Sequence, residues 1–396
     1  MKLLSTSCET LYLGWDGPLL PRAVSFLRER YSSDSAWSLR RLDCVLPSSH
    51  SARRLSWLLH SEAERNGLEL EAPRIMTIGQ LAENLYQPGQ PVALEFEQSL
   101  AWARVLQAMD ASELSPLLPV APPRDSISPW LEFAGTLRRM HEELAASRVT
   151  FSDVLEYAET ASERRRWELL NRLQRSYLVE LADAGLADPY TARSTAVLNR
   201  GCHSDRTIVL VGTSDLSDAL VEMLRSLDSP IIAMVSAPEI AANQFNEFGC
   251  VETESWVKHK LPLRDENLLS AGDMLDQSEA VAQVVAEFGK TYSADQVSVG
   301  VTDESQVGPI ELQLRGCGVS THRHLGWTIS ETAIGRLLDL TSTFLQRQNW
   351  QSLAALVRHA DVFRFINQRI GDEGQWIQQL DGLLAEHFPS CLLYTS

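Results

Sequence analysis

The sequence has no paired cysteines, no long apolar run and no excess of basic residues. Its six cysteines are scattered over 396 residues, with no C-x-x-C pair and no histidines at zinc spacing, which argues against a disulfide framework or a zinc motif. No segment approaches the roughly 18 consecutive apolar residues that a membrane-spanning helix needs. The first residues, MKLLSTSC, hold too few apolar side chains for a secretory leader. We therefore expect a soluble, cytoplasmic protein with reduced thiols.

The charge balance is acidic rather than basic. Aspartate and glutamate number 52 against 35 lysine and arginine residues, which gives a net charge of −17. A surface coated with positive charge for non-specific nucleic-acid binding is therefore not expected, although a local basic groove is compatible with this balance. The catalytic strings G-x-S-x-G and H-E-x-x-H are also missing. We expect no catalytic residue, metal or cofactor in this chain.

The chain does contain two successive strand–turn–helix units near its start. In the first, residues 10–13 form a run with β-branched and aromatic side chains before a glycine-bearing turn and a helical pattern at 22–27. In the second, the apolar run 42–46 precedes a serine-rich turn and an amphipathic helix over 52–66. Such units in series are typical of a parallel sheet with crossover helices.

A long helical block then interrupts this pattern. From Ile78 to about Asn199 the sequence favours helices and one proline-rich loop, and strands return only at 207–211 and 231–235, with a helix over 217–227 between them. We therefore expect the sheet that begins near the N-terminus to be completed after the helical block, which is looped out between its strands.

The turn after the first strand is where a phosphate-binding loop would lie. Such a loop needs inward backbone N–H groups, a lysine for the phosphates and a Ser or Thr hydroxyl for Mg²⁺. Here the turn carries Gly14, Asp16 and Gly17 with no Lys-Ser or Lys-Thr; Pro18 lacks an N–H, and Asp16 would repel an anion. The sequence favours a plain tight turn over a working phosphate loop.

Residues 207–227, TIVLVGTSDLSDALVEMLRSL, resemble the metal-and-base strand of UvrD-like superfamily 1 helicases. In those helicases the apolar strand ends in Asp-Glu, which serves Mg²⁺ and the attacking water. This chain has Gly212 and Thr213 there, and neither side chain can take either role. Residues 236–239 likewise differ from the phosphate-sensing residues of such helicases. The resemblance implies a helicase fold whose ATPase motifs are degenerate.

Further segments resemble the AddB subunit of bacterial AddAB helicase-nucleases. They are LPSSHSARRL at 46–55, PRIMTIGQL at 73–81, the strand at 209–212, SEAVA at 278–282 and GWTISETAIGRLL at 326–338. The resemblance is diffuse, but it spans nearly the whole chain. It implies a helicase-like N-terminal half ahead of a PD-(D/E)XK nuclease with an iron–sulfur cluster. Because neither the nuclease residues nor clustered cysteines occur here, it also implies an N-terminal fragment.

The expected fold class is α/β: a P-loop-NTPase-like, helicase-type parallel sheet domain with a large α-helical insertion, followed by a second, partial α/β domain with a helical insertion. In the second domain a helix over 278–289 precedes an expected strand at Val297–Val301. The expected segments are 1–80 plus 200–272 for the split sheet domain, 81–199 for its helical insertion, 273–335 for the start of the second α/β domain, 336–390 for a truncated helical insertion and 391–396 for a tail. That tail, CLLYTS, resembles a translated sequencing adapter, so we expect a natural chain that continues.

Two groups of residues are candidates for contact with nucleic acid. By the resemblance, Ser48, Ser49, Arg53 and Arg54 occupy the turn and helix start that contact a single-strand backbone, and hydroxyls with two arginines at a helix N-terminus suit phosphate. The alternative is that Ser49 or Ser51 caps the helix while the arginines lie on its solvated face.

The second group lies on a later loop, where His322, Arg323, His324 and Trp327 could stack on bases. For so small a group, an ordinary loop surface is the more frequent arrangement. His324 and Trp327 are the residues of this group that we carry forward as candidates.

The leading hypothesis is an ATPase-inactive, helicase-like part of a subunit that acts in DNA double-strand-break repair. It would bind single-stranded DNA or a duplex end and guide one strand toward a downstream nuclease domain, beside an AddA-like, ATP-driven partner subunit. The iron–sulfur cluster and Mg²⁺ would belong to that nuclease and not to this part. The alternative is an α/β interaction scaffold that binds no nucleic acid, which the net charge of −17 favours.

Overall fold

The computed structural model describes residues 8–33, 35–260, 263–289, 291–324, 326–371 and 374–387, except the side chains of residues 384 and 387. The fold is α/β, 58% helical, with a central parallel sheet. The chain divides into two compact units, Met1–Leu261 and Pro262–Ser396, and this division falls inside the segment 200–272 that was expected to belong to the sheet domain. The expected tail at 391–396 lies outside the described residues.

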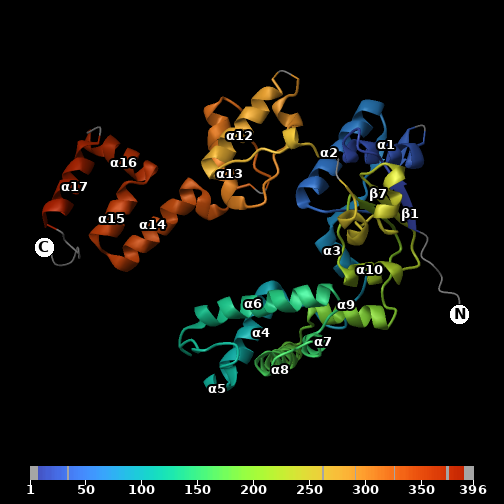
Figure 1. The fold of residues 1–396 in the computed structure, drawn as a ribbon, viewed down its shortest axis with the longest axis horizontal. Helices are drawn as coiled ribbons and strands as arrows, with labels where there is room; N and C mark the ends of the chain where they lie inside the picture. The colour runs from blue at the N-terminus through green and yellow to red at the C-terminus, as the bar shows by residue number, and fades with distance from the viewer. Residues whose placement is uncertain are drawn as a thin grey trace. The chain divides into compact units, whose positions relative to one another are not determined.

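Five parallel strands form the central sheet in the order β1-β7-β6-β3-β5. Their bounds are Cys8–Tyr12 for β1, Leu42–Leu46 for β3, Arg74–Thr77 for β5, Thr207–Val211 for β6 and Ile231–Val235 for β7. Strands from both sides of the helical block are neighbours, since Leu42 pairs with Thr207 and Cys8 with Ile231, and β1 and β7 lie together in Figure 1. The prediction of a split sheet is confirmed.

Helices cover both faces of this sheet. On one face, α1 (Leu19–Tyr31) and α2 (Ser49–Asn66) pack against alternate strand residues such as Cys44 and Val209. On the other face, α3 (Ile78–Asn84) and α10 (Asp218–Arg225) pack against the residues between them, such as Val45. Because both faces are buried, β3, β6 and β7 are mostly apolar and do not alternate with polar residues, although β3 also buries the charged Asp43. Strand β5 and the small parallel pair β2 (Ala36–Ser38) and β4 (Glu69–Glu71) were not predicted.

The segment between β5 and β6 is helical. Its further helices are α4 (Glu95–Ala108), α5 (Ala111–Leu114), α6 (Ile127–Ala146), α7 (Phe151–Leu155), α8 (Ala161–Asp183) and α9 (Pro189–Leu198). These helices enclose a core of their own, in which the rings of Trp102 and Tyr177 stack at 4.3 Å with Phe151 and Trp130 buried nearby. Helix α9 also packs against α10 through Ala192 and Ala196, so it joins this core to the face of the sheet that α3 and α10 cover.

A buried polar network fixes the start of α9. Asp188 is the N-cap of this helix and only 4% exposed. Its carboxylate accepts hydrogen bonds from the Tyr177 hydroxyl at 2.9 Å, the Thr191 backbone N–H at 2.8 Å and His141 Nε2 at 3.2 Å. Burial raises the pKa of Asp188, but the hydrogen bonds from His141 and Thr191 lower this pKa by more than burial raises it. The net pKa shift is therefore downward. The network therefore favours the charged carboxylate.

This shift makes a pH-dependent contribution to stability. A carboxyl whose pKa is lower in the folded state stabilises the fold above its unfolded pKa of about 3.9, and that stabilisation is lost as the pH falls through the folded value. Wild-type protein should therefore lose stability between neutral pH and pH of about 3 more steeply than Asp188→Asn. Urea unfolding at a series of pH values measures this, and parallel pH profiles for the two proteins would contradict it.

The second unit is helical over its described residues. Its elements, in which η marks a 3-10 helix, are η2 (Asp265–Asn267), α12 (Met274–Glu287), η3 (Ala294–Gln296), η4 (Glu304–Gln306), α13 (Val307–Gly316), η5 (Ile329–Glu331), α14 (Ala333–Arg347), α15 (Trp350–Val357), α16 (Ala360–Ile370) and α17 (Gln375–His387). Between the sheet and this unit the chain forms η1 (Glu239–Gln244) and α11 (Thr253–Val257). No described helix has both the length and the apolar character to cross a membrane.

The prediction of a strand at Val297–Val301 is wrong. These residues follow η3 without strand pairing, and the side chain of Val299 is 43% exposed. A parallel strand needs a neighbour for its N–H and C=O groups, and the described part of residues 262–396 offers no second strand. Helices α12 and α13, which flank the segment, pack on each other instead. The expected α/β character of residues 273–335 is therefore not present in the described residues.

Candidate functional site

The three segments that were compared with phosphate-loop and helicase motifs lie at one edge of the sheet. The loops after β1, β6 and β7 all leave its carboxyl edge, where open parallel α/β sheets bind their ligands. Backbone hydrogen bonds tie these loops together: Gly14 N–H donates to the Ala237 carbonyl at 2.8 Å, and Gly212 N–H donates to the Met234 carbonyl at 2.9 Å. This edge is therefore the candidate functional site.

The loop after β1 encloses a cation that belongs to the protein. The guanidinium of Arg22, from the first turns of α1, donates hydrogen bonds to the Leu13 carbonyl and, at 3.0 Å, to Asp16 Oδ1. The fit is close, because a Cβ added to Gly14 would lie 2.8 Å from Arg22 Nη1, and one added to Gly17 would lie 3.1 Å from Nη2. The hydrogen bond from Arg22 lowers the pKa of Asp16.

This arrangement inverts the electrostatics of a phosphate-binding loop. A phosphate loop turns N–H donors and a lysine toward an anion, whereas this loop turns carbonyl and carboxylate oxygens toward an arginine. Pro18 is the N-cap of α1 and contributes no N–H donor of its own. Arg22 and Asp16 form an ion pair at 2.8 Å in this loop, with side chains that are 31% and 84% exposed.

The loop after β6 is equally closed. Gly212 has a φ of +64°, and a Cβ at this position would lie 2.6 Å from Leu19 Cδ2. Thr213 is 3% exposed, and its Oγ1 has no hydrogen-bond partner among the described residues. Its carbonyl accepts the Cys250 thiol at 3.6 Å. At the end of β6, then, the chain presents a glycine held against α1 and a buried hydroxyl.

The loop after β7 fixes an exposed tryptophan on the first loop. Trp15 donates its indole N–H to the Ser236 carbonyl at 2.6 Å, although its side chain is 60% exposed. This hydrogen bond and the one from Gly14 N–H to the Ala237 carbonyl connect the loops after β1 and β7. The carbonyls of Ser236 and Ala237 thus hold the loop after β1.

The start of α2 lies at the same edge, because β3 is the neighbour of β6. Ser48 is the N-cap: its hydroxyl accepts the Ser51 N–H at 3.2 Å, and the Ser51 hydroxyl accepts the Ser48 N–H. The alternative that Ser49 or Ser51 is the N-cap is wrong in its residue, since Ser48 has the extended backbone that an N-cap needs and Ser51 completes a capping box with it. Ser49 is exposed in the first turn.

Arg53 and Arg54 are exposed on α2, as the sequence suggested, but a third residue joins them. The Arg54 guanidinium lies 4.5 Å from the ring centroid of Trp57, and the Trp57 side chain is 52% exposed. Sequence reasoning did not name Trp57. Its position about 200° around the helix from Leu55, at 3.6 residues per turn, would have placed it on the outer face.

The candidates His324 and Trp327 belong to the second compact unit, and the α2 residues belong to the first. Trp327 is 55% exposed, and the guanidinium of Arg323 lies 5.0 Å from its ring centroid. That arginine is already paired with Glu304 at 2.5 Å and with Glu331 at 3.1 Å. Two carboxylates neutralise the only arginine of this group, which weakens it as a phosphate contact.

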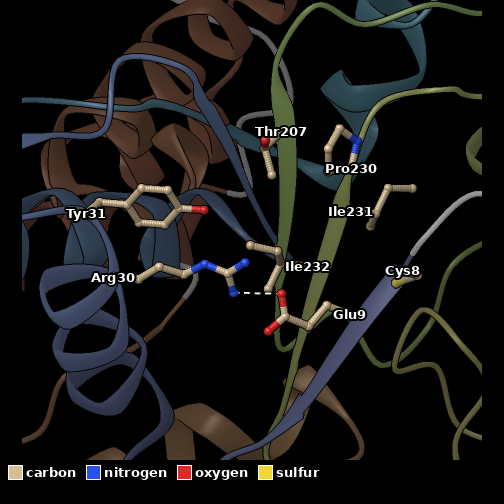
Figure 2. Close-up of a pocket in the computed structure, with 8 residues that line it drawn as sticks. All are labelled: Cys8, Glu9, Arg30, Tyr31, Thr207, Pro230, Ile231 and Ile232. Carbon is tan, nitrogen blue, oxygen red and sulfur yellow. Dashed lines mark hydrogen bonds and ion pairs between the residues drawn. The ribbon is translucent and has the colours of Figure 1, made fainter.

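A cavity of about 420 Å³ lies at the opposite, amino edge of the sheet, as Figure 2 shows. It is lined by Cys8, Glu9, Arg30, Tyr31, Thr207, Pro230, Ile231 and Ile232. Glu9 from β1 and Arg30 from α1 form an ion pair across it at 2.6 Å. Because parallel sheets bind ligands beyond their carboxyl ends, we do not place the functional site in this cavity.

No group of three or more His, Cys, Asp or Glu side chains within the described ranges could hold a metal ion. Comparison of the chain with family models and with curated proteins finds no match.

Proposed function

We propose that this chain is a helicase-like part of an AddB-like subunit that binds and guides a DNA strand without hydrolysing ATP. The observation that carries the proposal is the loop after β1, which closes around the guanidinium of Arg22 where a motor would hold triphosphate. The loop after β6 adds support, because Gly212 and Thr213 supply no carboxylate for magnesium or for an attacking water.

The P-loop-NTPase-like character of the fold belongs to the same proposal. It is supported by the order of the sheet, in which the three positions that resemble helicase motifs converge at one carboxyl edge. The helical block between β5 and β6 is consistent with a helicase-type insertion. A nuclease domain with an iron–sulfur cluster and Mg²⁺ and an AddA-like ATP-driven partner follow from the resemblance alone. A cytoplasmic location is proposed from the scattered cysteines.

Strand binding is the testable half of this function. Neutralising phosphates releases counterions, so affinity for single-stranded DNA should fall steeply with salt, with a slope of about −0.7 per phosphate contact on a logarithmic plot. The double variant Arg53→Ala/Arg54→Ala should bind more weakly at low salt and with a slope shallower by about 1.4. Fluorescence anisotropy with a labelled oligonucleotide measures both quantities.

A matched control is Arg165→Ala/Arg166→Ala, which removes two adjacent exposed arginines from α8. It should leave affinity and slope unchanged. Equal losses in the two double variants would mean that binding follows overall charge and not the α2 contact. Absence of binding by wild-type protein at low salt would favour the second candidate, an α/β interaction scaffold, which the net charge of −17 supports.

A further inference from the structure

One face of α2 carries an uninterrupted series of cationic and aromatic side chains. His50, Arg53, Arg54, Trp57 and His60 are all exposed, and at 3.6 residues per turn they lie within about one third of the helix circumference. We call these five residues the α2 stripe. The opposite side of the helix is anchored in the core by Leu55 and Leu59. The stripe is therefore a rigid surface and not part of a mobile loop.

The geometry within the stripe presents an aromatic ring with a cation beside it. Arg54 lies 4.5 Å from the ring centroid of Trp57, and about half of the Trp57 side chain remains exposed at 52%. His60 is held in place because its Nδ1 lies 2.8 Å from the Ser56 carbonyl. An arginine stacked on one part of an indole orients the ring and leaves the remaining surface for a planar ligand.

The region around α2 is less acidic than the rest of the chain. Residues 1–80 contain 10 lysine and arginine residues against 9 aspartate and glutamate residues, whereas residues 81–396 contain 25 against 43. Between Asp43 and Glu62 the sequence has no acidic residue at all. The α2 stripe is therefore complementary to a polyanion, and the N-terminal end of α2 adds the favourable end of the helix dipole.

We propose that the α2 stripe is a base-stacking platform for single-stranded nucleic acid, with Trp57 stacked on a base and Arg53 and Arg54 contacting the adjoining phosphates. The proposal rests on the proposed function and specifies its ligand. Stacking on an exposed ring requires an unstacked base, which a single strand offers and an intact duplex does not. Because every base has a π-face, binding at Trp57 tolerates any sequence.

The test separates bases from phosphates. We expect Trp57→Ala to weaken binding of the full chain to oligothymidylate by about 5- to 100-fold, and Trp57→Phe to weaken it less because a ring remains. An abasic strand of the same length should bind wild type and Trp57→Ala equally. Tyr157→Ala is the matched control, since Tyr157 is an 81% exposed aromatic residue between Glu156 and Glu159, and it should bind like wild type.

Each other outcome overturns a defined claim. If wild type binds oligothymidylate but Trp57→Ala binds it equally well, the platform is wrong while strand binding stands. The same conclusion follows if an intact duplex binds as tightly as the single strand and loses as much on Trp57→Ala. If wild type binds no nucleic acid, the proposed function and the platform fail together. Equal thermal unfolding midpoints for the variants exclude loss of fold as the cause.

Discussion

Asp43→Ala should lower the free energy of unfolding by about 3 kcal/mol, because it removes the buried carboxylate that Arg74 and Arg206 share. Asp43 lies on the interior strand β3, between β6 and β5, and is 2% exposed. Arg74 from β5 donates to Oδ1 at 3.0 Å and pairs with Oδ2, while Arg206, just before β6, places Nε 2.6 Å from Oδ1. The carboxylate thus joins three strands of the sheet.

The size of this effect follows from what the substitution leaves behind. Breaking a buried ion pair costs about 3–5 kcal/mol, since the remaining charge is uncompensated. The lower end applies here because the side chains of Arg74 and Arg206 are 45% and 26% exposed and reach solvent. Glu69→Ala, an exposed carboxylate on β4, is the control and should change stability by no more than about 0.5 kcal/mol. Urea unfolding measures both variants. If Asp43→Ala lowers the free energy of unfolding by as little as Glu69→Ala does, the ion pairs of Asp43 do not stabilise the fold.

Placing a carboxylate at the end of β6 should destabilise the fold and should not create an ATP-binding site. Gly212→Asp puts a side chain on a residue with a φ of +64°, where its Cβ would lie 2.6 Å from Leu19 Cδ2. The left-handed backbone costs about 1–2 kcal/mol and the overpacking about 1–3 kcal/mol, so a loss of about 2–5 kcal/mol is expected. Binding of Mg·ATP should not appear in this variant.

Gly79→Asp is the matched control for this substitution. Gly79 lies in the first turn of α3, and a Cβ there would meet nothing within 4 Å. An aspartate in a first turn also interacts favourably with the helix dipole. The control should be as stable as wild type or slightly more so. A Gly212→Asp protein with wild-type stability would contradict the account of a closed loop after β6.

The sheet was predictable where burial determines the residue types. Strands β3, β6 and β7 are rich in apolar residues on both faces, with Asp43 of β3 as an exception, so their bounds could be predicted from composition. Strand β5 could not, because Arg74 and Thr77 are half of its four residues, and only its pairing with β3 makes it a strand. At Val297–Val301 the opposite holds: the valine pattern suits a strand, but the described residues nearby provide no partner strand.

The site was predictable only in part. The ends of β1 and β6 can be located from the strands, so Gly14 and Gly212 could be named in advance. The role of Arg22 could not, since it depends on how the loop curves back toward the Leu13 carbonyl. Trp57 was missed because an apolar ring on an amphipathic helix is commonly read as core, whereas its angle on the helix places it outside.

Equilibrium binding of Mg·ATP to the full chain tests the central claim most directly. Because the loop after β1 already holds the Arg22 guanidinium against Leu13 and Asp16, we expect no saturable, magnesium-dependent binding and no ATP hydrolysis, with or without single-stranded DNA. Saturable binding of Mg·ATP that is lost on substitution of Asp16 or Gly17 would contradict the account.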